Sequence, residues 1–320
     1  MGTGMLKNFR VRNFKSIRDL SLYPKRINVF IGEPNAGKSN ILEALGFLSF
    51  GAYGSFANLR EFIRCENLSD LFYNRNVEGI VEIRLNSKTI ELKFENGRFA
   101  GLYKGEEVKD IIRGEGKSTV EELNFVKFYR FNPKADLRRL KGGGFLIPPV
   151  GENLFALLTY DRELRRLINN LLEPFDLKLI YEPDEGSFRV ILEKDELILL
   201  HYSLLSSTIQ RTIFYLTAIE SNEGSVLVFE EPESHAFPSY TKLLSERIAL
   251  DKGNNQFFIS THNPYFLIPL IEKAPEGDLV VFLTYYRDYQ TRVRALENEE
   301  LMKLLETDPF ELLKEKDDLC

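Results

Sequence analysis

Three carboxylates follow a short apolar strand in the second half of the chain. The stretch Ser225–Tyr240 reads SVLVFEEPESHAFPSY, and Glu230, Glu231 and Glu233 come after the apolar run Val226–Phe229. Charged groups at the end of a buried strand need a counter-charge, because burying an unpaired charge is costly. The pattern therefore predicts that these glutamates face a cation or take part in phosphate chemistry.

A glycine-rich loop near the N-terminus is the expected partner. The segment Ile27–Ile31, INVFI, is predicted to be a short buried strand. It leads into Gly32–Ser39, GEPNAGKS, and apolar residues then recur at helical spacing through Phe50. In such a strand, loop and helix, backbone N–H groups surround phosphate oxygens, a lysine reaches the β- and γ-phosphates and a hydroxyl ligates Mg²⁺. The residues predicted to bind nucleotide here are Gly32, Asn35, Ala36, Gly37, Lys38, Ser39 and Asn40.

The acidic strand end and a later histidine complete a plausible phosphate-hydrolysing set. Nucleotide hydrolysis at a P-loop needs an acid in the Mg²⁺ shell and a group that orients the attacking water. We predict Glu230 and Ser39 as the metal ligands and Glu231 as the catalytic carboxylate. The buried strand Gln256–Ser260 is followed by His262, which can hydrogen-bond the γ-phosphate or the attacking water. We predict it as the second catalytic residue.

A second segment contains the same GKS sequence as the glycine-rich loop but lacks the rest of the pattern. Gly114–Thr119 reads GEGKST, but the pattern needs a further glycine at the position of Ile111. No buried strand leads into it, so it is expected to be an exposed turn.

Composition limits the class of protein. The 320 residues are 43% hydrophobic and 28% charged, which is typical of a soluble globular protein. No apolar run approaches the roughly 20 residues that a membrane helix needs. Cys65 and Cys320 lack the spacing of a metal site or a disulfide framework, so a cytoplasmic location without membrane contact is expected. The net charge of −6 argues against a wholly basic nucleic-acid binder.

The strands and helices expected around these residues indicate an α/β fold with a mixed sheet core and an inserted middle lobe. We assign residues 1–131 and 222–320 to a discontinuous nucleotide-binding core lobe, and residues 132–221 to a middle helical and β lobe. The strands and helices expected outside the motifs are strands Gly79–Leu85 and Thr89–Phe94, helix Asn153–Leu172, a β meander Leu177–Glu182, Phe188–Glu193 and Glu196–Leu200, and a helical tail Asn298–Cys320.

The order of these motifs resembles the ABC-type ATPase heads of the RecF, SMC and OLD group. The resemblance rests on GKSN, a serine-rich helix start, a strand ending in EEPE, then STHNP, with FRVRNFKSIRDLSL as an opening strand and turn. It implies a P-loop NTPase fold, ATP and Mg²⁺ as ligands, and Lys15 beside the nucleotide. It also implies an ATP-dependent homodimer, in which Ser206 and Ser207 reach the ATP of the partner subunit.

The chain departs from that pattern in three places. Glu230 stands where the group usually has aspartate, and Thr208 stands where its signature has glycine. No glutamine precedes Gln210, so the usual Q-loop metal ligand is missing; Arg130 or Asn132 lies where that loop would fall.

The sequence leaves two biological roles open. One is DNA repair or maintenance, with DNA bound non-specifically by basic patches. These patches comprise Arg138, Arg139 and Lys141 and, near the N-terminus, Lys7, Arg10, Arg12, Lys15 and Arg18. The other is an ATP-switched regulatory subunit that controls a partner effector, a nuclease or toxin. A guanine-reading segment is absent, and because few residues follow His262 we expect no OLD-type nuclease domain.

Overall fold

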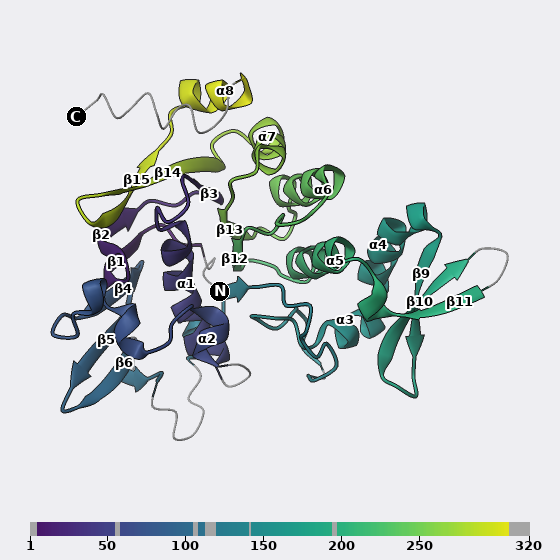
Figure 1. Cartoon of the computed structure of the whole chain (residues 1–320), viewed down its shortest axis with the longest axis horizontal. Helices are drawn as coiled ribbons and strands as arrows, with labels where there is room; N and C mark the ends of the chain where they lie inside the picture. Colours follow the sequence, from purple (N-terminus) through teal and green to yellow (C-terminus); the bar gives the residue numbers. More distant parts are fainter. Residues whose placement is uncertain are drawn as a thin grey trace.

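The structure, a computed structural model, describes residues 5–54, 58–104, 108–112, 120–140, 142–193 and 197–306. Three sheets and eight α-helices are defined within these ranges (Figure 1). The GEGKST stretch, Gly114–Thr119, lies outside the described residues. Among the helices that the structure describes, none has the length and apolar character to span a bilayer.

The central sheet carries every strand that the sequence linked to phosphate chemistry. Its six strands lie in the order β15 (Gln290–Ala295), β14 (Leu279–Arg287), β3 (Ile27–Ile31), β13 (Gln256–Ser260), β12 (Val226–Glu230) and β8 (Val126–Tyr129). All neighbours pair in parallel except β14 with β15. The carboxyl ends of the five parallel strands therefore meet at one edge of the sheet.

The pairing register brings the loops after these strands level with one another. Glu230 is paired with Ser260, and Ser260 is paired with Phe30 on β3. Strands β3, β12 and β13 are mostly apolar and are buried along almost their whole length, because both faces of the sheet are covered. The sheet thus holds the starts of three polar loops side by side.

Helices cover the two faces of the central sheet. Helix α1 (Lys38–Tyr53) shares one buried cluster with Phe30, Val228 and Phe258 of the sheet. The alternate residues Val29 and Phe229 belong to the cluster on the other face. That face packs against α5 (Ser207–Glu220), α6 (Pro238–Ala249) and α7 (Pro264–Lys273).

A second, antiparallel sheet lies on the α1 side of the molecule. Its strands follow the order β2 (Ile17–Leu22), β1 (Phe9–Phe14), β4 (Val81–Leu85), β5 (Lys88–Glu95), β6 (Arg98–Lys104) and β7 (Val108–Asp110). The expected strands β4 and β5 are confirmed, as is the opening hairpin, whose turn contains Lys15 and Ser16. The short helix α2 (Leu59–Phe62) follows α1.

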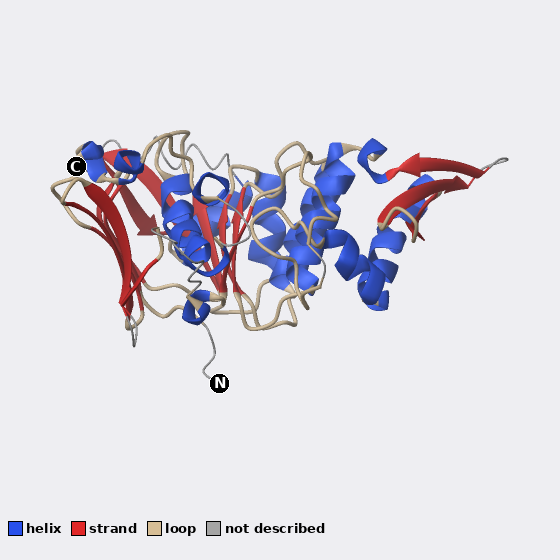
Figure 2. Cartoon of the chain, turned by 90° about the horizontal axis from the view of Figure 1, so that it is seen from below, coloured by secondary structure: helices blue, strands red, loops and turns tan. Residues whose placement is uncertain are grey.

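The middle segment forms helices and a third sheet at the far end of the molecule (Figure 2). The expected meander is confirmed as β9 (Leu177–Glu182), β10 (Ser187–Glu193) and β11 (Leu197–His201). The expected single helix is instead two, α3 (Leu154–Tyr160) and α4 (Arg162–Leu172). Asp161 separates them because its carboxylate accepts a hydrogen bond from the N–H of Leu164, at 2.9 Å, and so caps α4.

The boundary between a core lobe and a middle lobe at residues 132 and 221 stays a prediction. Helix α5 lies within the assigned middle lobe, yet it shares a buried cluster with the central sheet. Part of the helical tail is confirmed as α8 (Asn298–Glu306), and the remainder lies outside the described residues.

Candidate functional site

The glycine-rich loop has the backbone shape that a phosphate cradle requires. Gly37 precedes α1 with φ of +98°, and no side chain caps this helix start. The first N–H groups of α1 therefore face into the loop without a side-chain partner, as an anion site needs. Gly32 has φ of +144°, and a Cβ there would lie 2.1 Å from the carbonyl oxygen of Thr284. Both glycines are required by conformation and by space.

Lys38 lies inside this loop. Its ammonium donates hydrogen bonds to the carbonyl oxygens of Gly32, at 2.7 Å, and Glu33, at 2.9 Å. Burial lowers the pKa of Lys38 below its ordinary value, while the nearby charges of Glu231 and Glu33 oppose that shift. The lysine is thus held among loop carbonyls, close to the acidic strand end.

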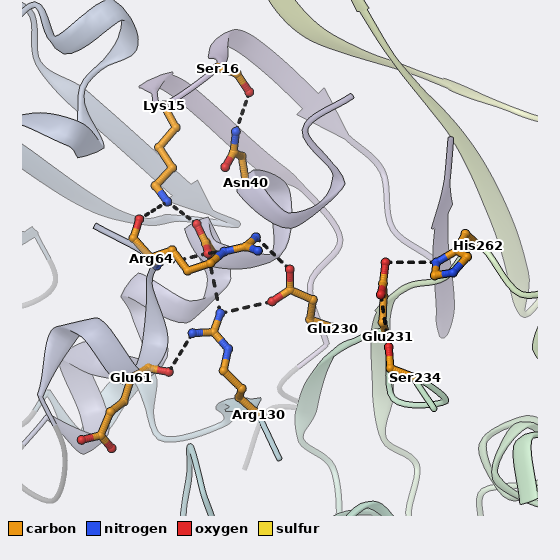
Figure 3. A network of polar contacts seen from close by, with 11 residues as sticks. Lys15, Ser16, Asn40, Glu61, Arg64, Arg130, Glu230, Glu231, Ser234 and His262 are labelled. Atoms are coloured by element: carbon orange, nitrogen blue, oxygen red, sulfur yellow. Dashed lines mark hydrogen bonds and ion pairs between the residues drawn. The ribbon is translucent and has the colours of Figure 1, made fainter. Parts of the chain in front are cut away.

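The far side of the loop rests on the opening hairpin and on β15. Thr291 donates its hydroxyl to the carbonyl oxygen of Ala36, at 3.0 Å, and its N–H to the carbonyl oxygen of Ser16, at 2.8 Å. The Ser16 hydroxyl lies 2.6 Å from that of Thr291 and accepts from the Asn40 amide at 2.6 Å. The side-chain amide of Asn40, predicted to bind nucleotide, therefore braces the loop from behind (Figure 3).

The three glutamates of the acidic strand end contact three different sets of side chains. Glu230 is paired with Arg64 and Arg130, whose nitrogens lie 2.8 Å and 3.1 Å from its two carboxylate oxygens. Glu231 accepts from the Ser234 hydroxyl at 3.1 Å and lies 3.1 Å from Nδ1 of His262 (Figure 3).

Glu233 is buried below these groups. Its carboxylate accepts a hydrogen bond from the Thr261 hydroxyl, and it is 2% exposed. Burial is the main cause that raises the pKa of Glu233 to about 7, although the hydrogen bond from Thr261 opposes the shift. This side chain connects the loop after β12 with the loop after β13, since Thr261 directly precedes His262.

The structure brings together the two residues predicted to be catalytic. His262 and Glu231 come from neighbouring strand ends, and both side chains are at least partly exposed. Glu231 has φ of +42°, a left-handed conformation that is rare for a residue with a Cβ. The Glu231 N–H donates to the carbonyl oxygen of Ser260 at 3.0 Å, which helps to hold this turn. Strained backbone of this kind is common at functional sites.

Two of the predicted ligand-binding groups have other partners. Lys15 donates to Glu43 and, at 2.6 Å, to the carbonyl oxygen of Arg64, so its ammonium is already paired (Figure 3). Ser206 and Ser207 are exposed at the start of α5, where the Ser206 hydroxyl accepts from the N–H of Ile209 at 3.3 Å. Hydrogen bonds within the described part of the chain do not join these serines to its own glycine-rich loop.

The other residues predicted to bind nucleotide lie in the glycine-rich loop and in the first turn of α1. Asn35 is exposed with φ of +63°, Ala36 is buried, and Ser39 is half-buried in the first turn of α1. Of the two candidates for the Q-loop position, Arg130 lies at the site, on Glu230. Asn132 is exposed, and its side chain accepts from the N–H of Lys134 at 3.0 Å.

The sequence interpretation missed Glu43 and Arg64. Glu43 is fully buried in α1 and is paired with Lys15 and with Arg64, whose Nε lies 2.7 Å away. One signal was available: Glu43 interrupts the apolar run of α1, and a glutamate in an apolar helix needs a buried counter-charge. Its partners could not be identified from spacing, because they come from the opening turn and from the segment after α2.

Comparisons with known proteins agree with this arrangement. The model of the family "AAA domain, putative AbiEii toxin, Type IV TA system" matches residues 67–268, more than half of the chain. A DNA replication and repair protein RecF from Bacillus cytotoxicus is 30% identical over 129 residues, which cover 38% of this chain and 33% of that protein. An ATP/GTP phosphatase from Helicobacter pylori is 22% identical, covering 56% of this chain and 51% of the relative.

The chain matches only about a third of the length of that RecF protein. A solved SMC head, bound in its crystal to the C-winged helix domain of ScpA, superposes with a TM-score of 0.60 at 13% identity. That superposition covers 92% of this chain and 99% of the SMC head, which establishes the fold. The chain belongs to the AAA domain family of that description, and it has the fold of a RecF- and SMC-like ABC-type ATPase head.

Proposed function

We propose that this chain binds ATP with Mg²⁺ and hydrolyses it, and that ATP drives the pairing of two copies. The observation that carries the proposal is the contact of Glu231 with His262, 3.1 Å, at the sheet edge where Lys38 occupies the glycine-rich loop. A carboxylate and an imidazole beside a phosphate cradle can orient and activate a water molecule.

The residues present fit a Mg²⁺–nucleotide complex. Mg²⁺ prefers oxygen ligands and commonly keeps only one or two from protein, with phosphate oxygens and water completing its octahedron. The Ser39 hydroxyl and the Glu230 carboxylate would hold it. Within the described residues no group of three or more His, Cys, Asp or Glu side chains could do so alone, which agrees with a shared site. When bound, the ion would neutralise charge on the β- and γ-phosphates.

The protein side chains then have separate tasks. Lys38 would place its ammonium on the β- and γ-phosphates, leaving the loop carbonyls that it contacts here. Glu231, held by Ser234 and His262, would orient the attacking water and accept its proton. If Nδ1 of His262 carries the hydrogen toward Glu231, its Nε2 is an acceptor for water at the γ-phosphate.

A second copy would complete the site. Leu204, Phe237 and Tyr265 are large apolar side chains that are each at least 60% exposed. Leu204 lies next to the serines at the start of α5, Phe237 lies in the loop after Glu233, and Tyr265 follows His262. Exposed apolar side chains beside polar site loops are typical of a surface that a protein partner covers. We propose a two-fold dimer in which Ser206 and Ser207 of one copy contact the ATP bound to the other.

The substitution Glu231→Gln tests this proposal. Glutamine preserves shape but removes the charge that activates water, so ATP should persist and keep the dimer closed. We expect the variant to sediment as a dimer with Mg-ATP and as a monomer without it, at micromolar protein. The matched control adds Ser206→Ala and Ser207→Ala to the Glu231→Gln chain. It should bind ATP but stay monomeric. A Glu231→Gln protein that binds ATP yet stays monomeric at every concentration contradicts the dimer.

For the biological role we propose DNA repair or maintenance, supported by the similarity to RecF. The family description favours a second candidate, an ATP-switched subunit of a toxin or other effector system. Several basic residues expected to contact DNA are paired with acids: Arg10 and Arg12 with Asp19, Arg138 with Asp136, and Arg139 with Glu152.

One measurement separates these two roles. ATP turnover should rise when DNA is added at physiological salt if DNA is the ligand, and the increase should fall at higher salt. Turnover that does not respond to DNA at any salt concentration favours control of an effector protein.

A further inference from the structure

Five charged side chains form one cluster at the predicted metal acid. Two are carboxylates, Glu43 and Glu230, and three are cations, Lys15, Arg64 and Arg130 (Figure 3). The Glu43 side chain is fully buried and that of Glu230 is 15% exposed, whereas Arg64 is 58% exposed. The cluster therefore extends from the buried face of α1 outward to the surface.

Both oxygens of Glu230 are occupied within this cluster. Nη2 of Arg64 lies 2.8 Å from Oε1 of Glu230, and Nη2 of Arg130 lies 3.1 Å from Oε2. A divalent cation needs at least one of these oxygens. Each oxygen keeps a second lone pair, but a guanidinium at contact distance repels a divalent cation bound to the same carboxylate. The two arginines therefore oppose binding of the ion, and moving one of them away favours it.

The same arginines have a second acceptor close by. Nε of Arg64 lies 2.7 Å from Oε1 of Glu43, and Nη2 of Arg130 lies 3.6 Å from that oxygen. A guanidinium that leaves Glu230 therefore stays paired with Glu43, so the guanidinium is not left as an isolated charge. This avoids the main penalty of breaking a partly buried ion pair.

We propose that Arg64 and Arg130 hold Glu230 in place of a divalent cation, and that Glu43 takes over the arginines when the cation binds. The inference rests on the proposed function in one respect, that Glu230 is a ligand of the nucleotide-bound metal. It adds two positioning residues, Arg64 and Arg130, and assigns to Glu43 the role of an alternative acceptor. Arg130, one of the two candidates for the Q-loop position, then competes with the metal instead of supplying an oxygen ligand.

The test measures Mn²⁺ affinity rather than turnover. Protein is saturated with a non-hydrolysable ATP analogue, and bound Mn²⁺ is followed by electron paramagnetic resonance. Arg130→Gln should bind Mn²⁺ roughly fivefold more tightly than the unmodified chain, the size expected from the loss of one partly exposed competing ion pair. Glu43→Gln should bind it more weakly, because the arginines then have only Glu230.

Controls separate this effect from general charge and from misfolding. Arg84→Gln removes a surface guanidinium paired with Glu82, at 3.2 Å, and should leave Mn²⁺ affinity unchanged. If Arg130→Gln does not fold, Arg64→Gln replaces a more exposed side chain and should shift affinity in the same direction. Circular dichroism and thermal unfolding establish which variants are folded.

The possible results are distinct. Unchanged or weaker Mn²⁺ binding by the folded arginine variant overturns the competition, as does tighter binding by Glu43→Gln. Binding of a fluorescent ATP analogue in EDTA is measured alongside. If the unmodified chain binds no nucleotide, the proposed function fails; if it binds nucleotide but the variants do not shift Mn²⁺ affinity, only this inference fails.

Discussion

Replacing Glu233 by glutamine should stabilise the fold at neutral and alkaline pH. Glu233 is 2% exposed, and its Oε2 has no hydrogen-bond partner among the residues that the structure describes. The ionised carboxylate is therefore a poorly compensated buried charge. Glutamine keeps the oxygen that accepts from Thr261 and removes the charge.

The size of the effect follows from the pKa. Burial raises the pKa of Glu233 to about 7, from an ordinary 4.5. The folded state holds the proton of the Glu233 carboxyl group more tightly than the unfolded chain does. The stability that this protonation provides is therefore fully present below pH 4.5. That stability is lost as pH rises toward about 7. At 1.36 kcal/mol per pKa unit, the loss amounts to about 3 kcal/mol.

Urea unfolding at pH 5 and pH 8 measures this difference. The free energy of unfolding of Glu233→Gln, relative to that of the unmodified chain, should be about 2 to 3 kcal/mol higher at pH 8 than at pH 5. Glu78→Gln, at an exposed glutamate, controls for the loss of one negative charge and should show little change. If the difference between Glu233→Gln and the unmodified chain is the same at both pH values, Glu233 does not titrate in this range and the reasoning is refuted.

Three further predictions concern the nucleotide site. Lys38→Ala should abolish nucleotide binding in calorimetry, because the phosphates lose the cation inside the loop; affinity equal to the unmodified chain would exclude this site. His262→Ala should lower turnover much more than ATP affinity, whereas equal losses would make it a binding or structural residue. Gly37→Ala should lower thermal stability, by about 1 to 3 kcal/mol, and weaken ATP binding. Its Cβ would lie 1.9 Å from the Thr291 hydroxyl oxygen at φ of +98°, so an unchanged melting temperature would show that the loop adapts.

The parts of the site that were predictable are those fixed by short stretches of chain. The loop Gly32–Ser39 and the acidic strand end were recognisable because each is bounded by apolar runs that form buried strands. The meander β9–β11 was predictable for the same reason. By contrast, Asp161 breaks the expected helix, since its capping bond outweighs the apolar periodicity that runs across it.

The parts that were not predictable depend on distant segments. Glu230, Glu231 and Glu233 each contact different side chains, and that choice depends on tertiary packing. Arg64 is 166 residues from Glu230 in sequence, and no local pattern links them. Thr291 supports the glycine-rich loop from 255 residues away, in a strand that carries no motif.

That support from β15 has a consequence for the order of folding. The glycine-rich loop is synthesised early, but its backing hydrogen bonds to Ser16 and Ala36 require Thr291. Contacts between residues so far apart in sequence form late, since the intervening chain must first be ordered. A growing chain that has already exposed every nucleotide-binding motif would therefore still lack a rigid phosphate cradle. Under the proposed function, competence to bind ATP would be gained only after Thr291 has been synthesised and packed against the loop.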